Sequence, residues 1–225
     1  MKETETLLLK PIFFSTPMVK TLLNTKIGVW PAEPIDASKP CKSQTRRVII
    51  PQPPKLRMID YTAEITTDKV KFWGGGTRHI TDMPLKYKVG DILYVRETWA
   101  DIEETSPGNI HYKASATEAD LQWFKENGWK WKPSIHMPRK AARLFLEVKS
   151  VRVERLQDIG HADVLAEGLT PQGCGCEVVV GGYCTVFREL WNSINAKHSC
   201  SWESNLWVFV YEFMRVEPAN EKDSD

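Results

Sequence analysis

The residues most able to do chemistry lie in one short stretch, Pro40 to Ile50 (PCKSQTRRVII). It places three cations and two hydroxyls directly before an apolar run. Such a group can bind phosphates, with Thr45 capping a turn. It can also support hydrolysis, because a threonine hydroxyl becomes a nucleophile when a base lies near it. Lys42 serves as that base only if its pKa is lowered by burial or by cations such as Arg46 and Arg47.

A second stretch, from Trp129 to Arg143, alternates cations with rings. The rings and cations are Trp129, Lys130, Trp131, Lys132, His136, Arg139, Lys140 and Arg143. Phosphate affinity beside stacking rings is typical of single-stranded RNA recognition. A solvated loop with tryptophans tucked beneath it explains the same pattern.

The segment Arg96-Glu97-Thr98-Trp99 adds a carboxylate and a ring to these candidates. A strand carboxylate such as Glu97 can accept a hydrogen bond from a cytosine amine, and Trp99 can stack on a flat ligand. The alternative for Glu97 is an ion pair with Arg96 or Arg143.

The five cysteines favour free thiols in a reducing compartment, because an odd number does not form a closed disulfide framework. A zinc set would combine Cys174, Cys176, Cys184, His198 and Cys200. The single residue between the first two is tighter than the usual spacing of structural zinc ligands. We therefore expect no metal and no other cofactor.

Composition describes an ordinary globular chain. Its 225 residues carry 30 Lys+Arg and 29 Asp+Glu, a net charge of +1, which excludes a generally basic nucleic-acid coat. No stretch approaches the roughly 20 apolar residues of a membrane span. We expect a cytoplasmic protein without membrane contact. The oligomeric state is open, with a monomer as the working expectation.

The elements that must position these residues follow from periodicity and capping. We expect helices near 16–23, 116–127, 161–167 and 186–194, and strands near 10–14, 48–50, 92–99, 144–153 and 206–216. From Pro51 through the glycine triplet ending at Gly76 the chain reads as irregular. Several strands with a few short helices predict an α+β, barrel-like single domain.

The order of these blocks resembles the ASCH domain family of the PUA-like superfamily. The segments FFSTPMVKTLL, QTRRVI, VGDILYVRETWA, WKPSIHMPR and SWESNLWVF are similar to ASCH proteins of bacteriophages and prophages. The resemblance covers most of residues 10–216. It implies a small mixed β-barrel with short flanking helices. This chain departs from the family by insertions near 26–40, 55–85 and 105–138, and we expect its polar tail at 217–225 to be disordered.

The resemblance also implies a function. Bacterial ASCH proteins include amidohydrolases of N(4)-acetylcytidine-type bases, and one relative cleaves RNA. Their functional Lys-x-x-Thr pair and later glutamate match Lys42, Thr45 and Glu167. Thr45 would be the nucleophile, Lys42 the base and Glu167 the acid/base, while Arg47 holds a phosphate or the oxyanion.

These three residues must then converge on one cleft, although Glu167 is more than a hundred residues from Thr45. Two other readings remain open. One is an RNA or modified-nucleic-acid binding module without chemistry, in which Lys42, Arg46 and Arg47 contact phosphates. The other is a phage accessory protein that docks on a host protein.

Overall fold

The computed structural model describes residues 9–54, 61–75, 78–102, 110–169 and 185–217. The strands are β1 (Lys10–Phe13), β2 (Gln44–Val48), β3 (Tyr61–Ile65), β4 (Lys69–Gly74), β5 (Arg78–Pro84), β6 (Ile92–Arg96), β7 (Trp99–Asp101), β8 (Ile110–Tyr112), β9 (Phe145–Arg155) and β10 (Trp207–Val216). The α-helices are α1 (Thr16–Leu23), α2 (Glu118–Glu126), α3 (His161–Ala166) and α4 (Thr185–Asn195). Short 3-10 helices are η1 (Lys113–Ser115), η2 (Ser134–His136), η3 (Arg139–Ala141), η4 (Leu156–Asp158), η5 (Ala196–His198) and η6 (Trp202–Ser204). The expected α+β class is confirmed.

A five-stranded sheet in the order β1-β6-β9-β10-β2 forms the centre of the molecule. β1 is parallel to β6, and the other pairs are antiparallel. The sheet is open, with β1 and β2 at its edges, and the sheets of the described residues do not close into a barrel.

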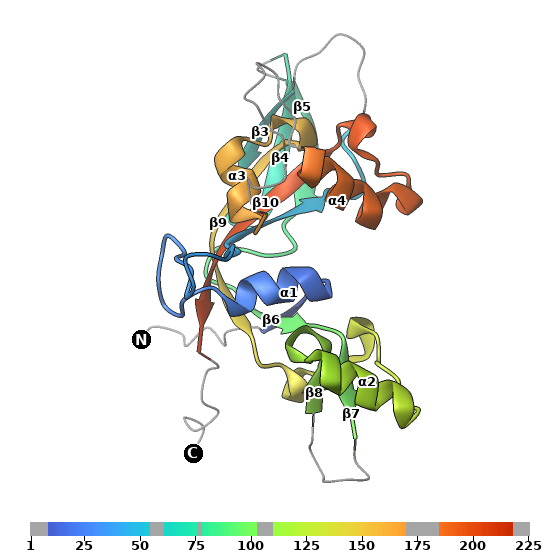
Figure 1. The fold of residues 1–225 in the computed structure, drawn as a ribbon. Coiled ribbons are helices and arrows are strands. Elements are labelled where there is room, and N and C mark those ends of the chain that lie inside the picture. The colour runs from blue at the N-terminus through green and yellow to red at the C-terminus, as the bar shows by residue number, and fades with distance from the viewer. Residues whose placement is uncertain (1–8, 55–60, 76–77, 103–109, 170–184, 218–225) are drawn as a thin grey trace.

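β10 explains how this sheet is covered on both faces. Phe209, Tyr211 and Phe213 belong to one hydrophobic cluster, together with residues of α1. Val208 and Val210 belong to another, together with residues of α3 and α4. Alternate residues of a strand point to opposite faces, so each side of β10 has its own apolar cover. Figure 1 shows α1 below this region and α4 beside its upper part.

The structure corrects the expected start of β2. The strand begins at Gln44, not at Val48, so Thr45 and both arginines are strand residues. They pair with β10, where Thr45 lies opposite Tyr211 and Arg47 opposite Phe209. Because side chains alternate along a strand, Thr45 and Arg47 share one face of the sheet.

A second correction concerns the segment expected to be irregular. Residues 61–84 include the three antiparallel strands β3, β4 and β5. β4 alternates between half-buried and buried residues, and Val70 and Phe72 reach the main core. The glycine triplet expected to form a turn begins with the last residue of β4, and Gly76 lies outside the described residues.

The strand expected over 92–99 is two strands. β6 ends at Arg96, and β7 starts at Trp99 in a separate two-stranded sheet with β8. This sheet and α2 form the lower lobe of the molecule (Figure 1). α2 begins with a capping box, in which Thr117 accepts from the Asp120 backbone N–H and the Asp120 side chain accepts in return.

The other helices and the long strands lie where the periodicity placed them, with small shifts at their ends. Ser15 is the N-cap of α1, and Pro17 lies in its first turn. No helix of the described residues is long and apolar enough to cross a membrane. The predicted disordered tail lies almost wholly outside the described residues, which end at Glu217.

Candidate active site

Lys42 and Glu167 form an ion pair inside the protein. Lys42 has 0% of its surface exposed and Glu167 has 4%. The Lys42 ammonium donates to the Glu167 backbone carbonyl at 2.8 Å and to Glu167 Oε2 at 2.7 Å. Burial lowers the pKa of Lys42, attraction to Glu167 opposes this, and the charges of Arg47 and Arg46 add to the lowering. The two residues, 125 positions apart, therefore meet as the resemblance implied.

Arg46 holds the other oxygen of the same carboxylate. It is 4% exposed, and its Nη1 donates to Glu167 Oε1 at 3.2 Å. Its Nε donates to Glu154 Oε1 at 3.1 Å, and its Nη2 lies 3.2 Å from Asp163 Oδ2. Each oxygen of Glu167 thus faces one cation, which fixes the plane of the carboxylate.

A close approach of backbone segments brings Glu167 to the loop before β2. Gly168, directly after it, has a φ of +86°, which favours glycine. A Cβ at Gly168 would lie 2.8 Å from Thr21 Oγ1 and 3.2 Å from Lys42 Cβ. The Ser43 N–H donates to the carbonyl of Ala166 at 2.9 Å. The end of α3 and the start of β2 are therefore tied together on both sides of the ion pair.

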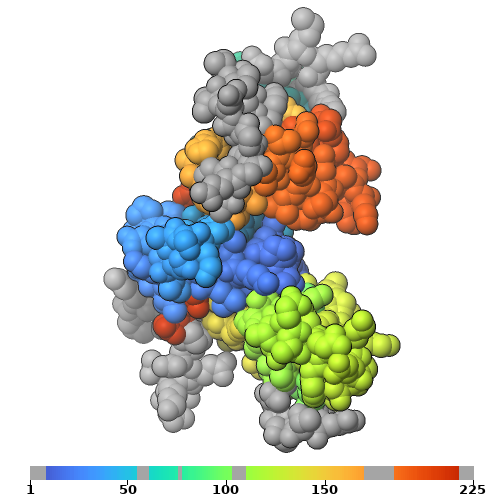
Figure 2. All heavy atoms as spheres, viewed as in Figure 1, coloured from blue at the N-terminus to red at the C-terminus, as the bar shows by residue number. Residues whose placement is uncertain are grey.

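A cleft of about 310 Å³ opens beside this pair. Its polar wall contains Thr45, Arg46, Arg47 and Glu167, but not Lys42. The facing wall and rim are Met18, Val48, Ile50, Lys86, Phe187, Leu190, Trp191, Ile194, Asn195, His198 and Cys200. Figure 2 shows the surface indented between the blue α1 segment and the orange α4 segment. Thr45 and Glu167 therefore share one cleft, while Lys42 supports Glu167 from behind.

Arg47 lies at the same cleft and is anchored to β1. Its Nη2 donates to the Phe13 carbonyl at 2.6 Å, and its guanidinium carbon lies 5.3 Å from the centre of the Phe14 ring. Burial lowers the pKa of Arg47. The guanidinium is thus held in one orientation by a neutral acceptor and a ring.

Glu97, which is buried, and the half-buried Arg143 form a separate ion pair in the lower part of the molecule. Arg143 Nε and Nη2 donate to the two oxygens of Glu97 at 2.8 and 3.0 Å. Arg143 also donates to Ser115 Oγ at 2.7 Å and covers the Tyr112 ring at 4.0 Å. Glu97 is 1% exposed. Of the two roles considered for Glu97, the structure shows the ion pair.

The two tryptophans proposed to stack on a ligand already contact protein groups. Trp99 is 6% exposed, and the Lys132 ammonium lies 4.9 Å from the centre of its ring. Trp131 stacks on Phe124 with ring centres 4.2 Å apart and planes 5° apart. Each ring therefore has one face occupied within the lower lobe.

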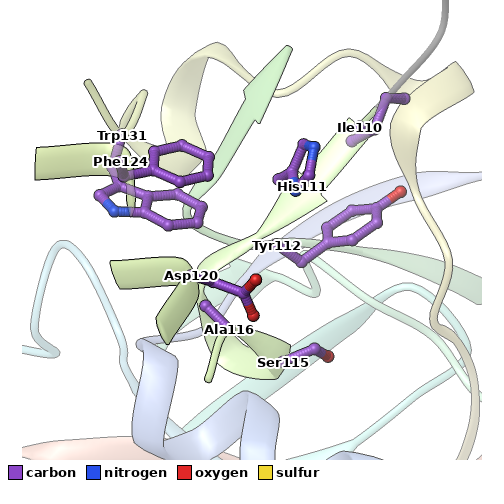
Figure 3. Close-up of a pocket in the computed structure, with 8 residues that line it drawn as sticks. All are labelled: Ile110, His111, Tyr112, Ser115, Ala116, Asp120, Phe124 and Trp131. Carbon is purple, nitrogen blue, oxygen red and sulfur yellow. The ribbon is translucent and has the colours of Figure 1, made fainter. Parts of the chain in front are cut away.

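Trp131 and Phe124 also line a smaller pocket of about 200 Å³. Its other residues are Ile110, His111, Tyr112, Ser115, Ala116 and Asp120. Figure 3 shows the stacked rings on one side and the Asp120 carboxylate directed toward the middle. That carboxylate accepts from the backbone and side chain of Thr117, and these bonds lower the pKa of Asp120. Asp120 thus has a local capping role here.

Two further candidates, His136 and Arg139, line neither pocket. His136 ends η2 and Arg139 begins η3, and both are exposed. Of the candidate zinc set, Cys174, Cys176 and Cys184 lie outside the described residues. His198 and Cys200 contribute to the wall of the cleft.

Several residues of the site were not predicted. Lys86 lies beside Arg47, and Glu154 and Asp163 hold Arg46. Phe187 and Trp191 were predicted only as the apolar face of a helix. Nothing local in the sequence marks Lys86, because its place depends on how the chain between β5 and β6 passes β2.

Comparison with known proteins does not add to this description. No protein family, no curated protein and no solved structure matches the chain. The likeness to ASCH proteins therefore depends on the motifs quoted above and on their order along the chain.

Proposed function

We propose that the protein is an ASCH-type amidohydrolase that removes the acyl group from an N-acylated cytidine-type base, on a PUA-like scaffold. One observation carries this proposal. Glu167, whose carboxylate is held by Lys42 and Arg46, lines the same cleft as Thr45. A nucleophile beside a positioned acid/base is what amide hydrolysis requires.

In the proposed reaction, Thr45 Oγ1 attacks the acyl carbon of the substrate. Its proton passes to the Lys42–Glu167 pair, entering at the Glu167 carboxylate, because that member lines the cleft. The carbon–nitrogen bond then breaks, and the same proton moves to the leaving amine. Water next attacks the Thr45 ester and returns a proton to the threonine oxygen through Glu167. The products are a carboxylic acid and the free amine of the base.

The remaining cleft residues fit a nucleoside. Phe187, Leu190 and Trp191 from α4 give one wall a flat, apolar character suited to a base. Arg47, on the same face of β2 as Thr45, can hold either a phosphate of the substrate or the oxyanion that forms during attack.

The test is turnover of N(4)-acetylcytidine by the full chain, followed by mass spectrometry as loss of the acetyl group. We expect Thr45→Ala and Glu167→Gln each to lower kcat by at least about 100-fold, with the double variant little worse than either. Thr62→Ala, an exposed strand threonine on β3, serves as the matched control. Retention of acylated nucleosides or RNA without any change in mass would instead favour the binding module.

A further inference from the structure

The cleft contains two kinds of cation. Lys42 and Arg46 are bonded to carboxylates. Arg47 and Lys86 line the same cleft, and in the part of the chain that the structure describes neither forms an ion pair with a carboxylate. Arg47 donates to a neutral carbonyl, and the Lys86 ammonium lies 5.4 Å from the centre of the Tyr87 ring.

The positive charge of Arg47 acts on Lys86, while the Glu167 carboxylate, which attracts Arg47, is already bonded to Lys42 and Arg46. Burial lowers the pKa of Lys86, and the positive charge of Arg47 lowers it further. Neighbouring like charges destabilise the empty site, and an anion that binds there removes this repulsion. A guanidinium and an ammonium are the groups that bind phosphate oxygens most often.

We infer that Arg47 and Lys86 bind a phosphate attached to the cytidine-type nucleoside, so that a nucleotide or an RNA residue is the preferred substrate over the free nucleoside. This inference rests on the proposed function, because Thr45 marks where the acylated base lies. Thr45 and Arg47 are two residues apart on one face of β2, a separation of about 7 Å. Because the Arg47 side chain is long, its guanidinium can lie farther than this from Thr45. The group that contacts the base and the group that contacts the phosphate are then about the length of a nucleoside apart.

Titration calorimetry of the full chain with cytidine 5′-monophosphate and with cytidine tests this inference. We expect the monophosphate to bind at least about tenfold more tightly, and Lys86→Gln and Arg47→Gln to lose most of that preference. Lys86 is exposed, so its variant should fold normally. Lys125→Gln, an exposed lysine of α2 outside the cleft, should keep the preference.

A short oligocytidylate RNA distinguishes the two sources of phosphate. If cytidine 5′-monophosphate binds more tightly than cytidine and Lys86→Gln removes the difference, the substrate is a nucleotide. If only the oligonucleotide binds more tightly than cytidine, the substrate is an RNA residue. Equal affinities of the wild type for cytidine and both phosphorylated ligands would overturn the inference, as would a preference that Lys86→Gln leaves intact. These ligands carry no acyl group, so the result does not depend on turnover. Hydrolysis of acetylcytidine without a phosphate preference would leave the proposed function standing alone.

Discussion

At the scale of single residues, the ion pair between the buried Lys42 and Glu167 determines how much a substitution at either residue lowers the free energy of unfolding. Removing one partner of such a pair leaves the other charge buried without compensation, which typically costs about 3–5 kcal/mol. Replacing both removes that penalty. Arg46 would still contact Glu154 and Asp163 in either case.

We therefore expect Lys42→Met and Glu167→Gln each to lower the free energy of unfolding by about 3 kcal/mol. The double variant should lose clearly less than the sum, because the two sites are coupled. Urea unfolding followed by tryptophan fluorescence measures this, with Lys20→Met, an exposed lysine of α1, as the control. Additive losses would show that the pair does not act as a unit.

At the scale of elements, Gly168 joins the end of α3 to the loop before β2. Gly90 provides a matched comparison, because its φ of +88° is nearly the same but no atom lies within 4 Å of an added Cβ. We expect Gly90→Ala to cost about 1–2 kcal/mol from backbone strain. Gly168→Ala should cost about 1–3 kcal/mol more, because its Cβ would press on Thr21 and Lys42.

The same urea experiment measures these losses, and turnover gives a second readout. Displacement of Lys42 and Glu167 should lower kcat in Gly168→Ala, whereas Gly90→Ala should keep its activity. Equal destabilisation by the two alanines would mean that the close approach at Gly168 relaxes without cost.

The sequence predicted elements whose signals are local. α2 is an example, because Thr117 and Asp120 cap it with each other. The β3–β5 sheet was missed, although β4 alternates in period two, because the prolines and glycines around it outweighed that pattern. The break between β6 and β7 was missed because Glu97 turns inward to meet Arg143, a contact between residues 46 positions apart.

In the candidate site, too, the residues with a local sequence signal were predicted and those placed by tertiary contacts were not. The motif around Lys42 and Thr45 was visible in the sequence, and the position of Glu167 came from the resemblance. The partners of Arg46 on β9 and α3 were not predicted, because they depend on the register of β9, β10 and β2. Lys86 reaches the cleft through tertiary packing alone.

At the scale of the whole molecule, a nearly neutral chain concentrates cations in two places. One is the cleft beside β2, and the other is the lower lobe, where Lys130 and Lys140 are exposed. A mononucleotide in the cleft would contact the first place only. A single-stranded RNA that extends from the cleft would reach the second and release counterions there.

We expect the affinity for a short single-stranded RNA to fall as the salt concentration rises. The double variant Lys130→Gln/Lys140→Gln should flatten the slope of log affinity against log salt by about 1.4, because each lost phosphate contact removes about 0.7. The slope for cytidine 5′-monophosphate should not change. Lys20→Gln/Lys39→Gln, which removes the same charge outside the cleft and the lower lobe, controls for net charge, and fluorescence anisotropy over a salt series measures the RNA slopes. An RNA slope that stays the same in the lower-lobe variant would confine RNA contact to the cleft. An equal change in both double variants would mean that net charge, and not the surface of the lower lobe, sets the affinity.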